Sequence, residues 1–384
     1  MNNNNIEFNI RKFLDDKAFF ISLFLTIMMY ALRFSLLDNY IAFKYLFIAM
    51  RLTSYSLLAI KFIYDYFKGN YNGTKAYIIL FGLFFLLISY KSRTINYLLY
   101  YIYIVVGKDI KYISIIKTAF TAIVISILII VICCKLKLIE DIIAYKGTRN
   151  RHSLGFKYTS YLATYTFYAI LYYIYIRNKN IRLVELIILL VINFIIFKLT
   201  NTRNPFIFGL TAIVLTFFYR YVSVVGIYNS FYSLCMKIAS ITFPILIVLI
   251  SYFYNENNAL LSFFNKMISG RLRLGYSALH NYGIKLFGQY VKITSGGVDG
   301  EVYNVIDSAH VLHLVLLGLA FYILTIVFFL YFAKLIEEKK DVCLSYIFVI
   351  IIAHAMFDPQ LLHISHNVFL FILSYKNSNV NYEQ

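Results

Sequence analysis

The sequence predicts an all-α protein, a polytopic transmembrane helical bundle. Its 384 residues are 61% hydrophobic and only 14% charged, with a mean hydropathy of +0.72, so too few polar residues exist to cover a water-soluble surface. Many apolar runs approach the roughly 20 residues that a helix needs to cross a bilayer. Only three prolines interrupt the chain, and its apolar runs lack the period-two alternation of barrel strands, which favours helices.

Apolar runs between charged or Gly/Asn-rich breaks define the candidate spans, several of them short, so we expect about 11–12 spans in total. No small-residue cleavage site follows the first run, which predicts a retained span and not a signal peptide. The spans are expected near 18–37, 41–66, 76–90, 94–106, 114–134, 158–176, 183–199, 205–219, 233–254, 310–332, 342–357 and 361–375.

One long polar segment, 255–308, separates an N-terminal transmembrane bundle (1–254) from the C-terminal transmembrane helices (309–384). With the N-terminus inside, the inner connections carry clustered Lys and Arg, and the long segment is an extracellular loop. The outer connections 135–157 and 198–204 are basic too, against the usual bias. We interpret their cations as functional groups at the outer face, and an inverted topology is the alternative.

Composition narrows the classes of partner. The chain has 37 tyrosines and no tryptophan, and tyrosines crowd at the ends of spans, so we expect them to form the interfacial belt. The four cysteines lie in or beside apolar runs without metal-ligand spacing, which predicts neither a disulfide framework nor a cysteine-held metal. The net charge of +18 comes without a nucleic-acid-binding motif, so it indicates anionic lipid and an anionic substrate, not nucleic acid.

The length and the many glycines of 255–308 favour a folded extracellular segment that contains short helices. Leu272, Tyr276 and Leu279 recur at three- and four-residue intervals, which predicts an amphipathic helix on the membrane surface within 269–289. The loop is basic up to Lys292 and then turns acidic, ending at Asp307. One part suits an anion and the other suits a base, and a merely solvated loop is the alternative.

Three strings of residues carry a resemblance to a known family. They are SGRLRLGYSALHNYGIKLFGQ (269–289), YNVIDSAHVLHLVLLG (303–318) and, more weakly, HSLGF (152–156). Together they resemble the outer loop of capsular polysaccharide polymerases of Gram-positive bacteria, the Wzy-type members of the O-antigen polymerase and ligase superfamily. The chain departs from the family after SLGF, where a proline–asparagine pair is common, and at His310, where an aromatic residue is commoner.

The resemblance implies a metal-independent, inverting glycosyltransferase in the cytoplasmic membrane of a bacterium. Such an enzyme joins undecaprenyl-diphosphate-linked oligosaccharide repeat units at the outer face, and undecaprenyl diphosphate is the leaving group. The implied partners are the lipid-linked oligosaccharide, membrane lipids and a chain-length-regulating copolymerase. No cofactor is implied.

Four residues are candidates for the chemistry. Arg271 is the first candidate to bind the diphosphate, because a guanidinium can bind two phosphate oxygens. Arg203, at the start of a span, is the second, with snorkelling to the interface as its alternative. Asp307 is the leading candidate to remove the proton of the attacking hydroxyl, with His310 as its substitute or partner, whereas helix capping beside Ser308 is the structural alternative.

Further residues are candidates for substrate binding. Amide, phenol, imidazole and basic groups can bind sugar hydroxyls or phosphates, and tyrosines can also stack on sugar faces; ordinary interfacial packing is the alternative for each. These candidates are Arg273, Tyr276, His280, Asn281, Lys285, Tyr303 and His152.

Near the last outer turn the sequence gathers His354, Asp358, His363 and His366. We interpret this group as a polar lining and not as a metal site, because the spacing does not place three ligands on one helical face.

Two other functions compete with a polymerase. A ligase-like transferase would share the donor chemistry. A lipid-linked oligosaccharide flippase or other transporter would show charged residues inside spans and related halves. The cations within spans, such as Arg33, Lys44, Arg51 and Lys237, are few and without an evident partner, which favours catalysis at the surface.

Overall fold

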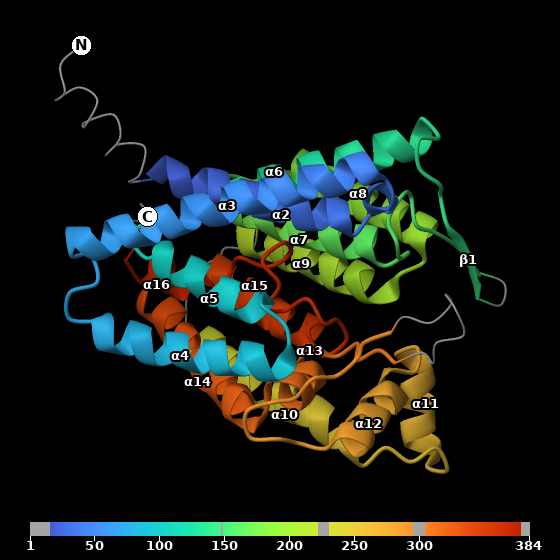
Figure 1. The fold of residues 1–384 in the computed structure, drawn as a ribbon. Helices are drawn as coiled ribbons and strands as arrows, with labels where there is room; N and C mark the ends of the chain where they lie inside the picture. Colours follow the sequence, from blue (N-terminus) through green and yellow to red (C-terminus); the bar gives the residue numbers. More distant parts are fainter. Residues whose placement is uncertain (1–15, 147–148, 222–229, 295–303, 378–384) are drawn as a thin grey trace. The chain divides into compact units, whose positions relative to one another are not determined.

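The computed structural model describes residues 16–146, 149–221, 230–294 and 304–377. The chain is an all-α membrane protein, about 74% helical, with fifteen α-helices and a single β-hairpin among the described residues (Figure 1). Six of the described helices are long and apolar enough to cross a membrane, and three shorter apolar helices accompany them. The helical membrane class predicted from composition is therefore confirmed.

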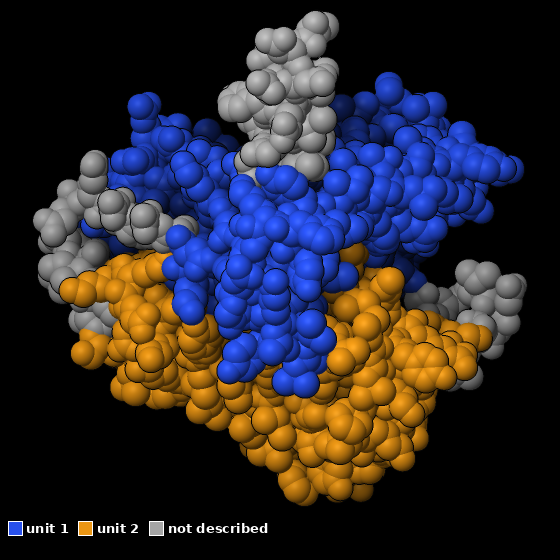
Figure 2. Space-filling view, turned by 60° about the vertical axis from the view of Figure 1, so that its left-hand side comes forward, with its two compact units in different colours: residues 1–80, 100–222, 363–384 blue, residues 81–99, 223–362 orange. Residues whose placement is uncertain are grey.

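The chain divides into two compact units, which Figure 2 shows in separate colours. Unit 1 comprises residues 1–80, 100–222 and 363–384, and unit 2 comprises residues 81–99 and 223–362. The helices α4 and α5 contribute residues to both units, so each unit is assembled from distant parts of the sequence.

Unit 1 centres on α2, which packs against α3 and α6, and on α7, which contacts α6, α8 and α9. Helix α3 ends where Gly69 adopts a left-handed conformation (φ 83°), as is usual after a helix. A short antiparallel hairpin joins α6 to α7 and pairs Ile143 with His152. The elements of unit 1 are α2 (Ala18–Arg33), η2 (Leu36–Asn39), α3 (Ile41–Lys68), the start of α4 (Lys75–Ser92), most of α5 (Asn96–Val106), α6 (Tyr112–Lys135), β1 (Ile143–Lys146), β2 (Arg149–His152), α7 (Tyr161–Arg177), η3 (Asn178–Asn180), α8 (Leu183–Thr200), α9 (Arg203–Tyr221) and α16 (Ile372–Asn377).

Unit 2 centres on α10, which packs against α12, α14 and α15. Side-chain caps fix two of its helix starts: Asn258 accepts a hydrogen bond from the Leu261 amide, and Asp341 accepts one from the Leu344 amide. The remaining elements of unit 2 are α10 (Ser230–Tyr252), α11 (Ala259–Met267), α12 (Arg271–Tyr282), α13 (Ala309–Leu312), the π-helical turn η4 (His313–Leu317), α14 (Leu319–Glu338) and α15 (Val342–His354).

Two of the predicted spans differ from the structure. The span expected over 310–332 is interrupted at Gly318, whose φ of 92° is incompatible with a continuous helix, and the long helix runs over Leu319–Glu338 instead. The helical span expected over 361–375 is wrong: this stretch is made of turns until the six-residue α16 begins at Ile372.

The expectation that cations within spans lack partners is also wrong for two of the four residues. In unit 2, Lys237 Nζ lies 2.8 Å from Glu337 Oε2. In unit 1, Arg33 Nε lies 4.0 Å from Asp38 Oδ1. Each contact joins residues of two different elements, so the periodicity of a single helix did not reveal it.

Tyrosine hydroxyls hold the irregular end of unit 1. Residues 364–372 are all buried and largely non-helical, so most of their backbone groups lack regular helical partners. The Tyr172 hydroxyl donates to the carbonyl of His366 (2.7 Å) and accepts from the amide of Val368 (2.8 Å). The hydroxyls of Tyr100 and Tyr112 donate to the carbonyls of Asn367 (2.8 Å) and Phe369 (2.7 Å).

These contacts change the role expected for tyrosine. Tyr100, Tyr112 and Tyr172 are buried, and they bond the backbone of the protein interior instead of forming an interfacial belt. A phenol suits this position because its ring fills an apolar core while its hydroxyl satisfies a buried polar group. Exposed tyrosines such as Tyr77 and Tyr90 remain available for the expected belt.

Two glycines allow a close crossing of backbones in unit 2. A Cβ added at Gly288 would lie 2.3 Å from the carbonyl oxygen of Leu316, and one added at Gly318 would lie 2.3 Å from the amide nitrogen of Gly288. The amide of Gln289 donates to the Leu316 carbonyl (3.0 Å), and its side chain donates to the carbonyl of Tyr282 (3.0 Å). This crossing fastens the segment after α12 to the start of α14.

Replacement of Tyr172 by phenylalanine should destabilise unit 1. Tyr172→Phe leaves one buried amide and one buried carbonyl without their partner, a loss of about 1–3 kcal/mol. We expect a lower apparent melting temperature in detergent, measured by size-exclusion chromatography of a fluorescent-protein fusion after heating. Tyr77→Phe is the matched control, because Tyr77 is 65% exposed. Equal melting temperatures for the two variants would contradict this role.

A methyl group at the glycine crossing should destabilise unit 2. Gly288→Ala adds overpacking, typically about 1–3 kcal/mol, to the strain of a positive φ. Gly270→Ala is the control for strain alone, since Gly270 has a φ of 90° with no atom near the added Cβ. The same melting assay should rank Gly288→Ala below Gly270→Ala, and the reverse order would refute the steric argument.

Candidate functional site

Arg271 is the first residue of α12 and is held mainly by backbone carbonyls. Gly270, in a left-handed conformation, turns the chain from α11 into α12. The Nε of Arg271 donates to the carbonyl of Phe357 (2.9 Å), and Nη1 donates to the carbonyl of Ile268 (2.9 Å). Among the described residues Nη2 has no protein acceptor within hydrogen-bond distance, so this edge of the guanidinium can take an anion.

Asp307 faces Arg271 across a longer contact. Its Oδ2 lies 3.7 Å from Arg271 Nε, and the two side chains are 28% and 21% exposed. Burial raises the pKa of the Asp307 carboxyl, and the Arg271 guanidinium only partly offsets this effect. The capping alternative belongs to the neighbouring residue, because the Ser308 hydroxyl accepts from the Val311 amide (3.4 Å).

The end of α15 fixes the segment that bears Asp307. The amide of Ala309 donates to the carbonyl of Ala355 (3.0 Å), and the Phe357 carbonyl that holds Arg271 lies in the same turn. Phe357 also packs against a small apolar cluster around Leu272. The turn after α15 therefore holds the Arg271 side chain and the backbone of the segment that bears Asp307.

His310 occupies the protein interior. Its ring is 1% exposed, and its Nε2 lies 3.2 Å from the carbonyl of Ile352, to which it donates. In this geometry a hydroxyl from outside does not reach the imidazole. The structure thus brings Arg271 and Asp307 together but gives His310 a contact to α15.

The opposite side of α12 lines an open cleft of about 730 Å³ in unit 2. Arg273 and Tyr276 come from α12, and Tyr252 and Tyr254 come from the end of α10. The His280 ring stacks on Tyr276 and on Tyr252, with ring centroids 3.9 and 5.0 Å apart. The cleft is open, and its lining combines tyrosine rings with amide and charged side chains that can bind hydroxyl groups.

The helix predicted within 269–289 is confirmed as α12, but its apolar face does not lie on the membrane surface. Leu272, Ala278 and Leu279 are 2–3% exposed and pack inside unit 2. Tyr276, which the periodicity assigned to the same apolar face, is instead 37% exposed.

The remaining candidates do not join this site in the structure. The side chains of Asn281 and Lys285 are exposed. The backbone carbonyl of Lys285 accepts a hydrogen bond from the Leu319 amide (2.9 Å). Tyr303 lies outside the described residues. Of the expected polar lining, His354 belongs to unit 2, whereas His363 belongs to unit 1.

His152 and Arg203 belong to unit 1. His152 Nδ1 lies 2.7 Å from Asp141 Oδ2, so this imidazole fixes β2 to the connection between α6 and β1. Arg203 is the exposed first residue of α9. Its neighbourhood is held by Arg151, whose guanidinium donates to the carbonyl of Thr200 (3.1 Å) and to the hydroxyl of Thr202 (3.2 Å).

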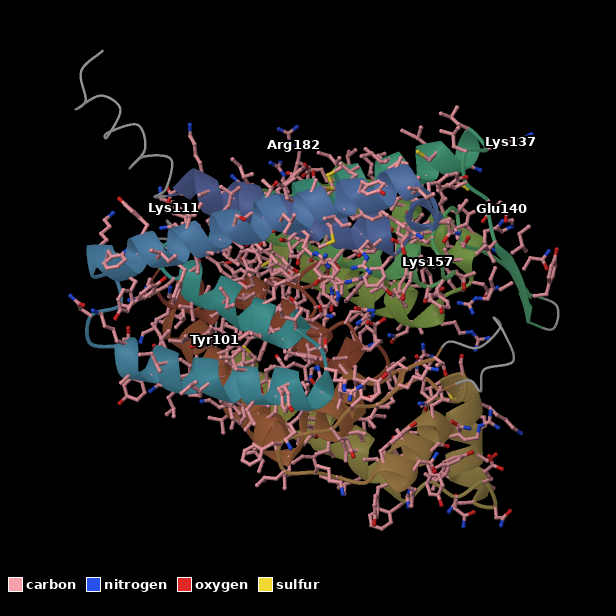
Figure 3. All side chains as sticks on the ribbon, in the orientation of Figure 1. Tyr101, Lys111, Lys137, Glu140, Lys157 and Arg182 are labelled. Carbon is pink, nitrogen blue, oxygen red and sulfur yellow. The ribbon has the colours of Figure 1, made fainter. Side chains whose placement is uncertain are left out.

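Several cations in the basic connection 135–157 have structural partners. Lys157 Nζ lies 2.6 Å from Asp38 Oδ2. Figure 3 shows that Lys157 lies toward the hairpin end of unit 1, where Lys137 and Glu140 also lie. Lys157 and Arg151 therefore anchor this connection to the rest of unit 1. The functional role that we expected of its cations stays a prediction for the other basic residues.

Sequence reasoning missed the groups that orient the site. The carbonyls of Ile268 and Phe357 hold Arg271, and backbone acceptors leave no signal in a sequence. Asn304 was missed as well: its side-chain amide donates to the Tyr282 hydroxyl (2.7 Å) and to the Lys292 carbonyl (2.7 Å). Both motif strings, LFGQ and YNVIDS, therefore contain residues that fasten the loop.

Comparisons with known proteins add no relative: no protein-family model, curated protein or solved structure matches this chain.

Removal of the Asp307 charge should stabilise the protein at neutral pH. Burial raises the pKa of Asp307 in the folded state. The stability that the protonated carboxyl contributes is therefore fully present below the pKa of the unfolded state and is lost as the pH rises through the pKa of the folded state. Asp307→Asn should therefore melt at a higher temperature than the wild type at neutral pH, and the difference should shrink on acidification. Glu256→Gln, at a carboxylate that is 67% exposed, is the control for the loss of an acidic charge from the same loop. A destabilised Asp307→Asn at neutral pH would show that the ion pair outweighs burial.

Proposed function

We propose that this protein is a polysaccharide polymerase of the cytoplasmic membrane of a bacterium, which joins undecaprenyl-diphosphate-linked oligosaccharide repeat units at the outer face. One observation carries the proposal: Arg271 and Asp307, chosen as anion binder and base, lie 3.7 Å apart in a site built by α12 and the turn after α15. The resemblance of the surrounding strings to Wzy-type polymerases supplies the reaction.

In this reaction a sugar hydroxyl of the acceptor attacks the anomeric carbon of the donor. The new carbon–oxygen bond forms as the bond to the diphosphate breaks, and the configuration inverts. Arg271 binds the departing diphosphate oxygens, where negative charge develops. Asp307 accepts the hydroxyl proton, and its raised pKa makes it a stronger base than an ordinary aspartate.

Arg271 and Asp307 contact each other before the substrate binds, so Arg271 acts first and Asp307 acts after it. A diphosphate bound to the free edge of the guanidinium competes with Asp307 for the positive charge. The carboxylate is then released toward the acceptor hydroxyl, while the Phe357 and Ile268 carbonyls keep Arg271 in place. The cleft lined by Tyr276 and Arg273, with His280 stacked on Tyr276, is the proposed position for sugar rings of the substrate. Membrane lipids and a chain-length-regulating copolymerase are the proposed partners.

A ligase-like transferase would use the same donor site, and the acceptor it takes distinguishes it from a polymerase. The transporter alternative gains one observation, because Lys61 and Asp65 form a buried ion pair (2.7 Å) within the long apolar helix α3. Asn70 also donates to the same carboxylate oxygen, Asp65 Oδ1 (3.0 Å), so the pair has a third structural partner. The Lys61–Asp65 pair is therefore the observation that favours transport, and the reconstitution assay distinguishes the two functions.

Reconstitution tests the proposed reaction. Purified protein in liposomes with a synthetic lipid-linked repeat unit should form polymer. It should release one undecaprenyl diphosphate for each glycosidic bond that forms. Arg271→Ala should lower the rate by about a hundredfold or more, because one fixed donor to the developing charge is lost. Polymer length by gel electrophoresis and released diphosphate by mass spectrometry are the two measurements.

Lys334→Ala is the control for the loss of a cation in unit 2, since Lys334 is 66% exposed on α14. Its rate should match that of the wild type, and both variants should elute as folded protein. Normal polymer from Arg271→Ala would remove Arg271 from the site. Transfer only to a foreign acceptor would establish the ligase, and movement of intact donor across the bilayer without diphosphate release would establish a transporter.

A further inference from the structure

Helix α11 (Ala259–Met267) carries its apolar residues on the side that the protein leaves uncovered. Leu260, Phe263, Phe264 and Met267 follow the i, i+3, i+4, i+7 spacing of one helical face. They are 64%, 60%, 47% and 54% exposed, and no residue of α11 is buried. An apolar face of this kind in water would be unfavourable, so something of low polarity covers it.

The polar side of α11 faces the protein, which fixes the direction of its apolar side. The Asn265 side chain donates to the Tyr254 hydroxyl (3.0 Å) and accepts from the Arg273 amide (3.2 Å). Leu261 packs on the small apolar cluster around Leu272. The helix is therefore anchored to the segment just after α10 and to the start of α12, and it lies beside α12 in Figure 1.

Helix α11 follows a candidate span that has an exposed apolar stripe of its own. Helix α10 is long and apolar enough to cross a membrane. It exposes one stripe along its length, and Tyr252 and Phe253 at its end are 45% and 69% exposed. A short connection then leads to α11. The residues of the α10 stripe are Leu234, Ile238, Ile241, Ile245 and Leu249.

We propose that α11 is an interfacial helix that lies in the plane of the membrane at the end of α10. Leu260, Phe263, Phe264 and Met267 contact the upper acyl chains of the phospholipids, and the basic Lys266 lies among their headgroups. A second copy of the chain is a poorer occupant, because a nine-residue helix offers far less than the roughly 800 Å² per partner of a stable interface.

This placement has a consequence for Arg271 that does not depend on the reaction. Only Ile268, Ser269 and Gly270 separate α11 from Arg271, and the Ile268 carbonyl that binds Arg271 lies in this connection. An α11 fixed at the membrane surface therefore fixes this guanidinium at the depth of the lipid phosphates.

The absence of tryptophan from the sequence provides a direct test. Phe263→Trp introduces the only indole into the full-length protein, which is then reconstituted in nanodiscs of phosphatidylcholine brominated either near the headgroup or near the chain end. We expect most of the fluorescence to be lost with bromine near the headgroup and little with bromine near the chain end. Leu249→Trp, on the exposed stripe of α10, should be quenched by bromine in acyl chains, and Asn257→Trp, in the exposed connection, by neither lipid.

The result for Phe263→Trp decides the proposal if the protein elutes as a single folded species. Phe264→Trp, on the same face, serves as an independent second reporter. Quenching no stronger than that of Asn257→Trp would overturn the proposal. A blue-shifted emission without quenching would overturn it too, because protein and not lipid would then cover the face. Neither outcome bears on the polymerase proposal, since no substrate is used.

Discussion

Buried backbone groups must find partners, and where this protein abandons the helix, side chains supply them. Helices satisfy their own amides and carbonyls, but the turns over 363–371 cannot. In unit 1, Tyr100, Tyr112 and Tyr172 extend from three separate helices to this one segment. The phenols thus tie α5, α6 and α7 to the C-terminal end of the chain. Without them the segment would either unfold or become helical, and its contacts with three helices would be lost.

The same constraint shapes the candidate site in unit 2. Gln289 and Asn304 use their side-chain amides on backbone carbonyls of the loop, and Arg271 uses its guanidinium on two more. Arg271 is therefore a structural donor as well as a candidate anion binder. Its fork geometry allows both, because the groups that hold it occupy only part of its five N–H donors. A lysine at this position would have no comparable way to hold a fixed direction.

The sequence predicts those parts of the structure that depend on periodic or local signals. Hydropathy locates the long helices, and the spacing of Leu272 and Leu279 predicts α12. The charges at Arg271 and Asp307 identify two residues that the fold brings together. Other features depend on contacts that carry no local signal. The run 361–375 has the composition of a buried helix, yet its backbone is bonded by tyrosines up to 267 residues away in the chain. Phe357 binds Arg271 with its backbone carbonyl, which every residue type has, so the sequence gives no sign of this role.

The distances around Arg271 indicate which contact orients it and which can be exchanged. Two carbonyls at 2.9 Å hold the guanidinium, whereas Asp307 lies at 3.7 Å and carries the cost of a partly buried charge. An anion that binds the free Nη2 edge can compete with the carboxylate for the positive charge without displacing the arginine. The carboxylate then loses its only nearby cation among the described residues, and its pKa rises further, so its affinity for a proton increases when the anion is present. A site held by its carboxylate would lack this coupling, because the anion would have to displace the group that orients the arginine. The weakness of the Arg271–Asp307 contact is therefore the property that suits this pair to the proposed reaction.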